Sequence, residues 1–182
     1  MKSFRRMLSV LAFVALSAVA FAQSDPQKPE AQKSDAQKSF DKMKTLAGSW
    51  DGVLSGTGSE LDGKTLHVTL RVTSMGNALL HEMTGLPGRP DDPITMVYLD
   101  GDRLMLTHYC DAGNRPRMNG KTSPDGKTVE FDFLDVAGST QYGHMHHAVF
   151  TFLDANHHTE EWTYMQPGDK PVRAHVDLQR TK

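Results

Sequence analysis

Three of the aspartate-glycine pairs divide much of the sequence into short segments in which apolar and polar residues alternate. The pairs are Asp62-Gly63, Asp100-Gly101 and Asp125-Gly126, and such dipeptides favour the tight type I′ turns of β-hairpins. The alternation is clearest in residues 64–74 and 128–134. Because side chains along a strand point to opposite faces in turn, each segment offers one face to a core and one to solvent. The pattern predicts an antiparallel protein built from hairpins.

Three further pairs of turn residues, Gly76-Asn77, Asn119-Gly120 and Pro167-Gly168, complete this division of the chain. The segments between the turns give about ten strand candidates, at residues 50–57, 64–74, 78–84, 94–100, 103–110, 115–121, 128–134, 145–153, 159–166 and 171–180. Many short strands joined by tight turns form either an up-and-down barrel or a sandwich. Because closure leaves no edge strands, we predict an all-β fold, a closed antiparallel up-and-down β-barrel of about ten strands. A barrel of this size can hold one small ligand.

The N-terminus has the layout of a secretory signal peptide. It begins with the basic residues Lys2, Arg5 and Arg6, continues with an uncharged apolar run, and closes with the small-residue pattern Ala20-Phe21-Ala22. A membrane anchor is the alternative, but the apolar run is short for the roughly 30 Å of hydrocarbon that a helix must cross. We therefore expect residues 1–22 to be removed and the protein to be exported, to the periplasm or outside the cell.

Two further regions follow the predicted signal peptide. Residues 23–38 are polar and contain the sequence AQKS twice, so we expect a disordered spacer there, with a frayed extension of the next helix as the alternative. Residues 39–46 are predicted to form one short helix, because Phe40 and Met43 begin an apolar stripe at helical spacing. Residues 39–182 are then a single barrel domain.

Charge and cysteine content limit the classes of partner. The chain has 20 basic and 22 acidic residues, and removal of the signal peptide would make it more acidic. Nucleic acids and anionic membranes are bound through an excess of lysine and arginine, so neither is expected as a partner. No later segment is apolar enough to span a bilayer. Cys110 is the only cysteine, which excludes an internal disulfide, so the core must hold the fold unaided.

The segment Leu46-Ala47-Gly48-Ser49-Trp50 resembles the start of the calycin superfamily, the lipocalin and fatty-acid-binding-protein barrels, in which a short helix leads into Gly-x-Trp on the first strand. The resemblance implies that Trp50 closes one end of the barrel. It also implies that Arg180, on the last strand, packs across the tryptophan ring through a cation–π contact. The resemblance thus implies that Trp50 and Arg180 stabilise the fold and do not bind a ligand.

The remainder of the chain is similar to a DUF1579-type group of exported bacterial proteins of unknown function. The similar segments are residues 92–98, 106–110, 114–118 and 143–146. More distantly, Gly48-Ser49-Trp50-Asp51-Gly52 resembles the opening motif of nitrobindin, a calycin barrel that binds haem through a histidine. These resemblances imply a fold and say little about chemistry.

The nine histidines are the main chemical signal in the sequence. His108 and Cys110 are two residues apart in one predicted strand and therefore share a face, as do His144 and His146 in another, with His147 on the opposite face. Imidazole and thiolate suit zinc or copper, and imidazole alone can ligate haem iron. The candidate metal ligands are His108, Cys110, His144 and His146. The alternative is that the histidines are scattered and have only structural roles.

A second set of residues could bind an organic ligand inside the barrel. Its polar or amphipathic members are set within predicted strands: Tyr98, His108, Arg117, His144, His146 and Trp162. A buried Arg117 would need a carboxylate partner or an anionic ligand, and an exposed Arg117 on the barrel wall is equally compatible with the sequence. The set favours an apolar cavity with a few orienting polar groups.

Three functions are compatible with these patterns. The leading hypothesis is an exported binding protein that holds a small lipophilic or anionic amphiphilic ligand in the barrel. The second is a haem or metal protein with redox or isomerase activity, using His108, His144 or His146. The third is a scaffold without catalytic activity that acts through partner proteins. The sequence identifies no catalytic residue and does not decide the oligomeric state.

Overall fold

The computed structural model describes residues 32–88 and 93–181. The predicted signal peptide and most of the predicted spacer lie outside these residues. Helix α1 spans Asp35–Lys44 and is capped by Ser34, whose hydroxyl oxygen accepts the backbone N–H of Gln37 at 3.2 Å. The helix therefore begins before the predicted boundary at residue 39, and residues 35–38 belong to it. No helix in the described part of the chain is long and apolar enough to cross a membrane.

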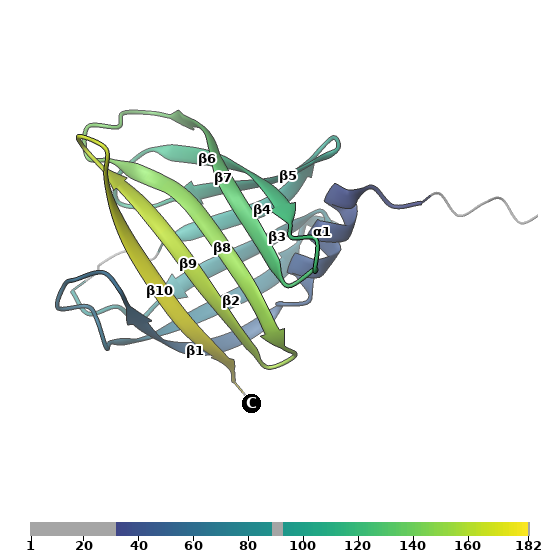
Figure 1. The fold of residues 1–182 in the computed structure, drawn as a ribbon, viewed down its shortest axis with the longest axis horizontal. Helices are drawn as coiled ribbons and strands as arrows, with labels where there is room; N and C mark the ends of the chain where they lie inside the picture. Colours follow the sequence, from purple (N-terminus) through teal and green to yellow (C-terminus); the bar gives the residue numbers. More distant parts are fainter. Residues whose placement is uncertain (1–31, 89–92, 182) are drawn as a thin grey trace, which may run out of the picture. The chain divides into compact units, whose positions relative to one another are not determined.

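Ten strands follow the helix, and they confirm the predicted number and arrangement. They are β1 (Gly48–Ser55), β2 (Thr65–Thr73), β3 (Ala78–Thr84), β4 (Ile94–Asp100), β5 (Arg103–Tyr109), β6 (Arg115–Thr122), β7 (Thr128–Ala137), β8 (His144–Asp154), β9 (His157–Gln166) and β10 (Lys170–Arg180). Each strand pairs antiparallel with its neighbours in the sequence, and β1 pairs with β10 to close the barrel (Figure 1). The fold is the closed up-and-down barrel that the alternation predicts.

The alternation of each strand determines what the barrel encloses. In β2 the inward side chains are Leu66, Val68 and Leu70, all 2% exposed or less. In β7 they include Val129 and Phe131, which are fully buried. These side chains meet in one apolar core inside the barrel.

Helix α1 lies across one end of the barrel (Figure 1). Its residues Phe40 and Met43, with Leu46 just beyond it, are buried in the barrel core. Because the strands run alternately up and down, the loops after β1, β3 and β5 lie at the opposite end. The helix therefore covers one end of the interior.

The first and last strands are fastened where they meet. The guanidinium of Arg180 lies 4.1 Å from the centre of the Trp50 ring and donates hydrogen bonds to the backbone carbonyls of Ala47 and Thr45, at 2.8 and 3.2 Å. The indole N–H of Trp50 donates to the carbonyl of Leu46 at 2.9 Å. Gly48 makes this packing geometrically feasible, because a side chain there would collide with the guanidinium. The structure thus brings Trp50 and Arg180 together at the closed end.

Candidate functional site

The interior of the barrel contains a cavity of about 370 Å³ towards the end opposite α1. Its rim includes loop residues such as Thr57, Leu86 and Cys110, and its wall consists mainly of apolar side chains. The described lining residues are Leu54, Thr57, Leu61, His81, Met83, Leu86, Pro93, Thr95, His108, Cys110, Asp111, Met145, Trp162, Tyr164, Ala174 and Val176. A concave, mainly apolar site of this volume with a few polar groups is typical of small-molecule sites.

A buried carboxylate lies behind the wall of this cavity. Glu160, on β9, is fully buried, and its oxygens accept hydrogen bonds from three ring nitrogens. Nε2 of His81 lies 3.0 Å from Oε2, Nε2 of His158 lies 3.1 Å from Oε1, and Nε1 of Trp162 lies 3.0 Å from Oε2. Two of these partners, His81 and Trp162, also line the cavity. The network therefore fixes the orientation of two rings that a ligand would touch.

This environment keeps Glu160 ionised. Burial by itself raises the pKa of a carboxyl group, but the charge of His81 and the hydrogen bonds from His158 and His81 outweigh it here, so the pKa of Glu160 lies well below its ordinary value. A buried carboxylate is tolerated when its oxygens are hydrogen-bonded in this way. The interior of the barrel thus holds a fixed negative charge close to the cavity wall.

A second imidazole in the cavity wall, that of His108 on β5, carries no charge. Its Nδ1 shares a hydrogen bond of 2.8 Å with the hydroxyl of Thr95, and its ring lies 5.7 Å from the ring of Trp162. Burial, followed by the charge of His81, lowers the pKa of His108 to about 3. His108 is therefore uncharged at neutral pH and presents a neutral ring to the cavity.

One imidazole in the cavity wall has an unused polar atom. Nδ1 of His81 is buried and has no hydrogen-bond partner among the described residues, and the same is true of Nδ1 of His158, which packs edge-on against Trp50. An unpartnered buried polar atom costs free energy. His81 lines the cavity and His158 does not, so His81 is the residue of this pair that a bound molecule can reach.

Only part of the predicted ligand-binding set lines the cavity. His108 and Trp162 do, as does the candidate metal ligand Cys110. Tyr98 alternates with the core residues Val97 and Leu99, so it lies on the outer face of the barrel, where its hydroxyl contacts Thr107 at 3.1 Å.

Arg117 lies on the outer face of the barrel, so its predicted role inside the cavity is wrong. It alternates with the buried Pro116 and Met118 on β6, which directs its own side chain outward. There it forms a two-pronged ion pair with Asp135 on β7, with Nε 2.8 Å from Oδ1. Its carboxylate partner is thus on the protein surface, and Arg117 does not meet an anion inside the barrel.

His144 and His146 also lie away from the cavity. Strand β8 has an extra residue between Met145 and His147, which shifts the pairing with β9. Met145 consequently lines the cavity, whereas the rings of His144 and His146 pack on Phe133, at 4.7 and 4.9 Å. The four candidate metal ligands are therefore divided between two places, with His108 and Cys110 at the cavity and the other two on Phe133.

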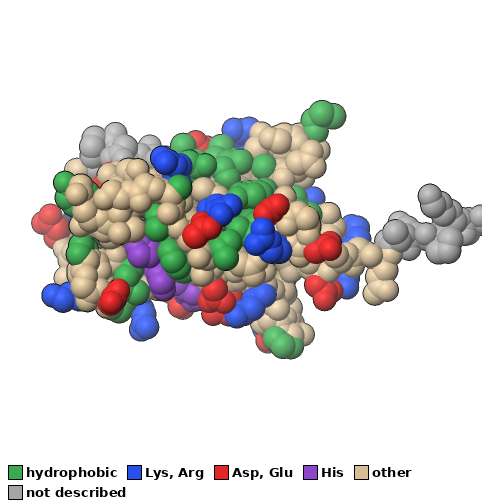
Figure 2. Space-filling view, turned by 90° about the horizontal axis from the view of Figure 1, so that it is seen from above, with side chains coloured by type: hydrophobic (Ala, Val, Ile, Leu, Met, Phe, Trp, Pro, Cys, Tyr) green, Lys and Arg blue, Asp and Glu red, His purple; other side chains and the backbone are tan. Residues whose placement is uncertain are grey.

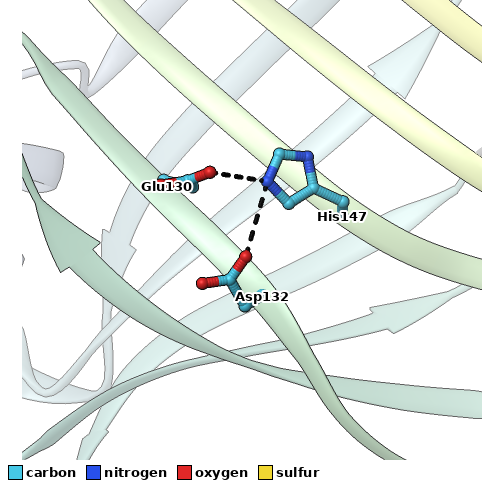
Figure 3. A group of neighbouring side chains, drawn as sticks. All are labelled: Glu130, Asp132 and His147. Carbon is cyan, nitrogen blue, oxygen red and sulfur yellow. Dashed lines mark hydrogen bonds and ion pairs between the residues drawn. The ribbon is translucent and has the colours of Figure 1, made fainter.

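His147 alternates with the buried Ala148 and therefore lies on the outer face, beside two carboxylates of β7 (Figure 3). Nε2 of His147 lies 3.0 Å from Glu130 Oε1 and 3.6 Å from Asp132 Oδ1. These three residues are close enough together to hold a metal ion. However, the ammonium group of Lys121 already contacts both carboxylates, at 3.4 and 2.9 Å. Acidic and basic side chains are interspersed on the face shown in Figure 2, and we interpret the cluster as one such surface ion-pair network.

His81, His158 and Glu160 are not among the site residues predicted from the sequence. Strand β9 begins at His157, and its alternation directs His158 inward, where it is fully buried. The usable signal was Glu160, a charged residue on the same face of an alternating strand as Trp162. A charge at an inward position indicates a buried partner.

Comparison with known proteins shows similarity in fold only. No family model matches the chain, and no curated protein matches it. Among solved structures, Rv2717c from M. tuberculosis is 12% identical with a TM-score of 0.59, over 79% of this chain and 98% of that chain. A protein of unknown function from the DUF3598 family of Nostoc punctiforme is 9% identical with a TM-score of 0.52, over 76% of this chain and 48% of that one. At such identities the similarity shows a shared barrel fold alone.

Proposed function

We propose that the protein is a binding protein that holds one small, mainly apolar molecule in the barrel cavity. The observation that carries the proposal is the cavity itself, about 370 Å³ in volume and open opposite α1. Apolar side chains such as Leu54, Met83 and Val176 form most of its wall, and His81 and His108 add polar atoms. This combination favours an apolar body with one polar group.

The volume limits the size of the ligand. At about 30 Å³ for each water-sized group, the cavity has room for about twelve non-hydrogen atoms. A medium-length aliphatic chain or a substituted single ring has this size. The position of Arg117 on the outer face removes the main argument for an anionic amphiphile, so the lipophilic part of the original hypothesis is the part that the cavity supports.

We also propose export, on the grounds of the sequence of residues 1–22 alone. In that setting the protein would bind its ligand in the periplasm or outside the cell. The test therefore starts from the full precursor expressed in a bacterial host, with the protein recovered from the periplasmic fraction.

The masses of this protein before and after denaturation provide the first test. We expect a mass lost on denaturation that corresponds to a small organic molecule. Haem or a metal ion, the alternatives that the sequence leaves open, would be recognised by their own masses. Absence of any bound mass, together with no binding of apolar probes of suitable size, would contradict the proposal.

A matched pair of variants assigns the binding to the cavity. Ala174 on β10 lines the cavity, and its neighbour His175 faces outward on the same strand. Ala174→Phe adds a ring inside the cavity and should reduce ligand retention about tenfold or more, whereas His175→Phe places the same side chain on the outer face and should not change it. Equal retention by the two variants would show that the ligand binds elsewhere.

A further inference from the structure

We infer that the cavity selects an uncharged ligand whose polar group is a hydroxyl, and that it excludes carboxylates of the same size. The inference rests on the proposed function and specifies its ligand class. It follows from the charges in and behind the cavity wall, and from the hydrogen-bonding groups that the wall presents.

Among the described residues that line the cavity, no cationic side chain is available to hold an anion, because the charge of His81 is already paired with the carboxylate of Glu160. The described residues that line it include neither lysine nor arginine. His108, which lines it, is kept uncharged by burial. Arg117, the residue that the sequence suggests for an anion, is on the outer face and already pairs with Asp135. A carboxylate in the cavity would therefore be a buried charge without a cationic partner.

Negative charge is already present close to the cavity wall. The ionised Glu160 contacts His81 and Trp162 from behind, and both rings form part of the wall. Asp111 is also among the lining residues. Nε2 of His81 already forms an ion pair with the carboxylate of Glu160, so His81 does not offer its charge to a ligand. A second carboxylate at this position would be repelled by the first.

A hydroxyl group fits the polar atoms that remain. Nδ1 of His81 is buried without a partner, and His108 shares its own Nδ1 with Thr95. Because Nε2 of His81 donates to the carboxylate of Glu160, its Nδ1 is an acceptor in the neutral ring and a donor in the protonated ring. A hydroxyl both donates and accepts, so it can pair with Nδ1 in either state, while a purely apolar ligand would leave this nitrogen unpartnered. An aliphatic alcohol or a phenol therefore suits the cavity best.

Decanol and decanoate form a matched pair of probes. They have the same chain length and about the size that the cavity admits, and decanoate is ionised at pH 8. Isothermal titration calorimetry at that pH should give decanol a dissociation constant lower than that of decanoate by about tenfold or more. Fluorescence of Trp162, which lines the cavity, provides an independent signal of entry.

The variant Glu160→Gln tests the cause of the selectivity. It keeps the shape of the side chain and removes the charge, so the ratio of the two dissociation constants should fall at least about threefold towards unity. This comparison cancels the intrinsic difference in hydrophobicity between the probes. The control is Glu161→Gln, the next residue on β9, which is exposed on the outer face and should leave the ratio unchanged.

The outcomes separate the inference from the proposed function. Decanoate binding as tightly as decanol, or a ratio that is the same in Glu160→Gln and the wild type, would overturn the inference and leave a cavity-binding protein standing. Absence of binding by both probes to a folded wild-type protein would overturn the inference and count against the proposed function as well.

Discussion

Nε2 of His81 on β3 lies 3.0 Å from Oε2 of Glu160 on β9, so this contact crosses the interior of the barrel between strands that are not neighbours. The backbone ladders join each strand to the next, whereas this pair joins distant parts of the wall. Both side chains are almost completely buried. The pair therefore contributes to the shape of the interior as well as to its charge.

Removing the carboxylate should strongly destabilise the protein. Glu160→Ala leaves two imidazoles and the indole of Trp162 without their common acceptor, and breaking a buried pair of this kind costs about 3–5 kcal/mol. Urea unfolding at pH 7 measures the free energy of unfolding. Glu161→Ala on the exposed face of β9 should change it by less than about 0.5 kcal/mol. Similar values for the two variants would show that the buried network is not stabilising.

His108 should make the protein less stable in mild acid. In the unfolded chain its pKa is near 6.5, whereas burial holds it at about 3 in the folded state. Between these values the unfolded state binds more protons, so the free energy of unfolding falls as the pH falls, by about 1.4 kcal/mol per pH unit from this residue. The contribution is complete above pH 6.5 and decreases below it.

The variant His108→Gln isolates this effect. Urea unfolding of the wild type and the variant at pH 7 and pH 5 gives two differences in stability. We expect the wild type to lose about 2 kcal/mol more than the variant over this interval. The expectation fails if the difference between the two proteins is the same at both pH values, since His108 would then titrate alike in the folded and unfolded states.

The sequence predicts the fold well because strand alternation reports directly which side chains are buried. Val68 and Leu70 indicate an inward face in β2 without knowledge of any other strand, and the turn dipeptides mark where each strand ends. The same reasoning fails at His146, because an extra residue within a strand leaves the local composition unchanged and reverses the faces that follow.

The site is less predictable because its residues are brought together only by closure of the barrel. His81 and Glu160 are 79 residues apart, and nothing in either strand identifies the other as its partner. Arg117 shows the opposite case. Its alternation with Pro116 and Met118 was visible in the sequence, but deciding which set faces inward required the register with β5 and β7.

The surface position of Arg117 predicts that its replacement has little effect. Arg117→Ala removes an ion pair whose two side chains are 45% and 47% exposed, and such pairs contribute about 0–1 kcal/mol. Ligand retention, measured by mass before and after denaturation, should equal that of the wild type. Loss of the ligand with unchanged stability would instead place a part of the binding site on the outer face, near β6 and β7.

The contact between Gly48 and Arg180 predicts a specific sensitivity at the barrel seam. Gly48 has a φ of +145°, and a side chain there would also collide with the guanidinium that covers Trp50. Gly48→Ala should therefore cost backbone strain of about 1–3 kcal/mol and, in addition, displace Arg180.

A second glycine separates these two effects. Gly58 has a φ of +67°, and a side chain there would meet no atom within 4 Å, so Gly58→Ala should cost strain alone. In urea unfolding, Gly48→Ala should lose clearly more stability than Gly58→Ala. In an Arg180→Ala background the excess should become smaller, because the collision is then removed. An excess of unchanged size without Arg180 would mean that the glycine is required by the backbone of β1 and not by the contact with the last strand.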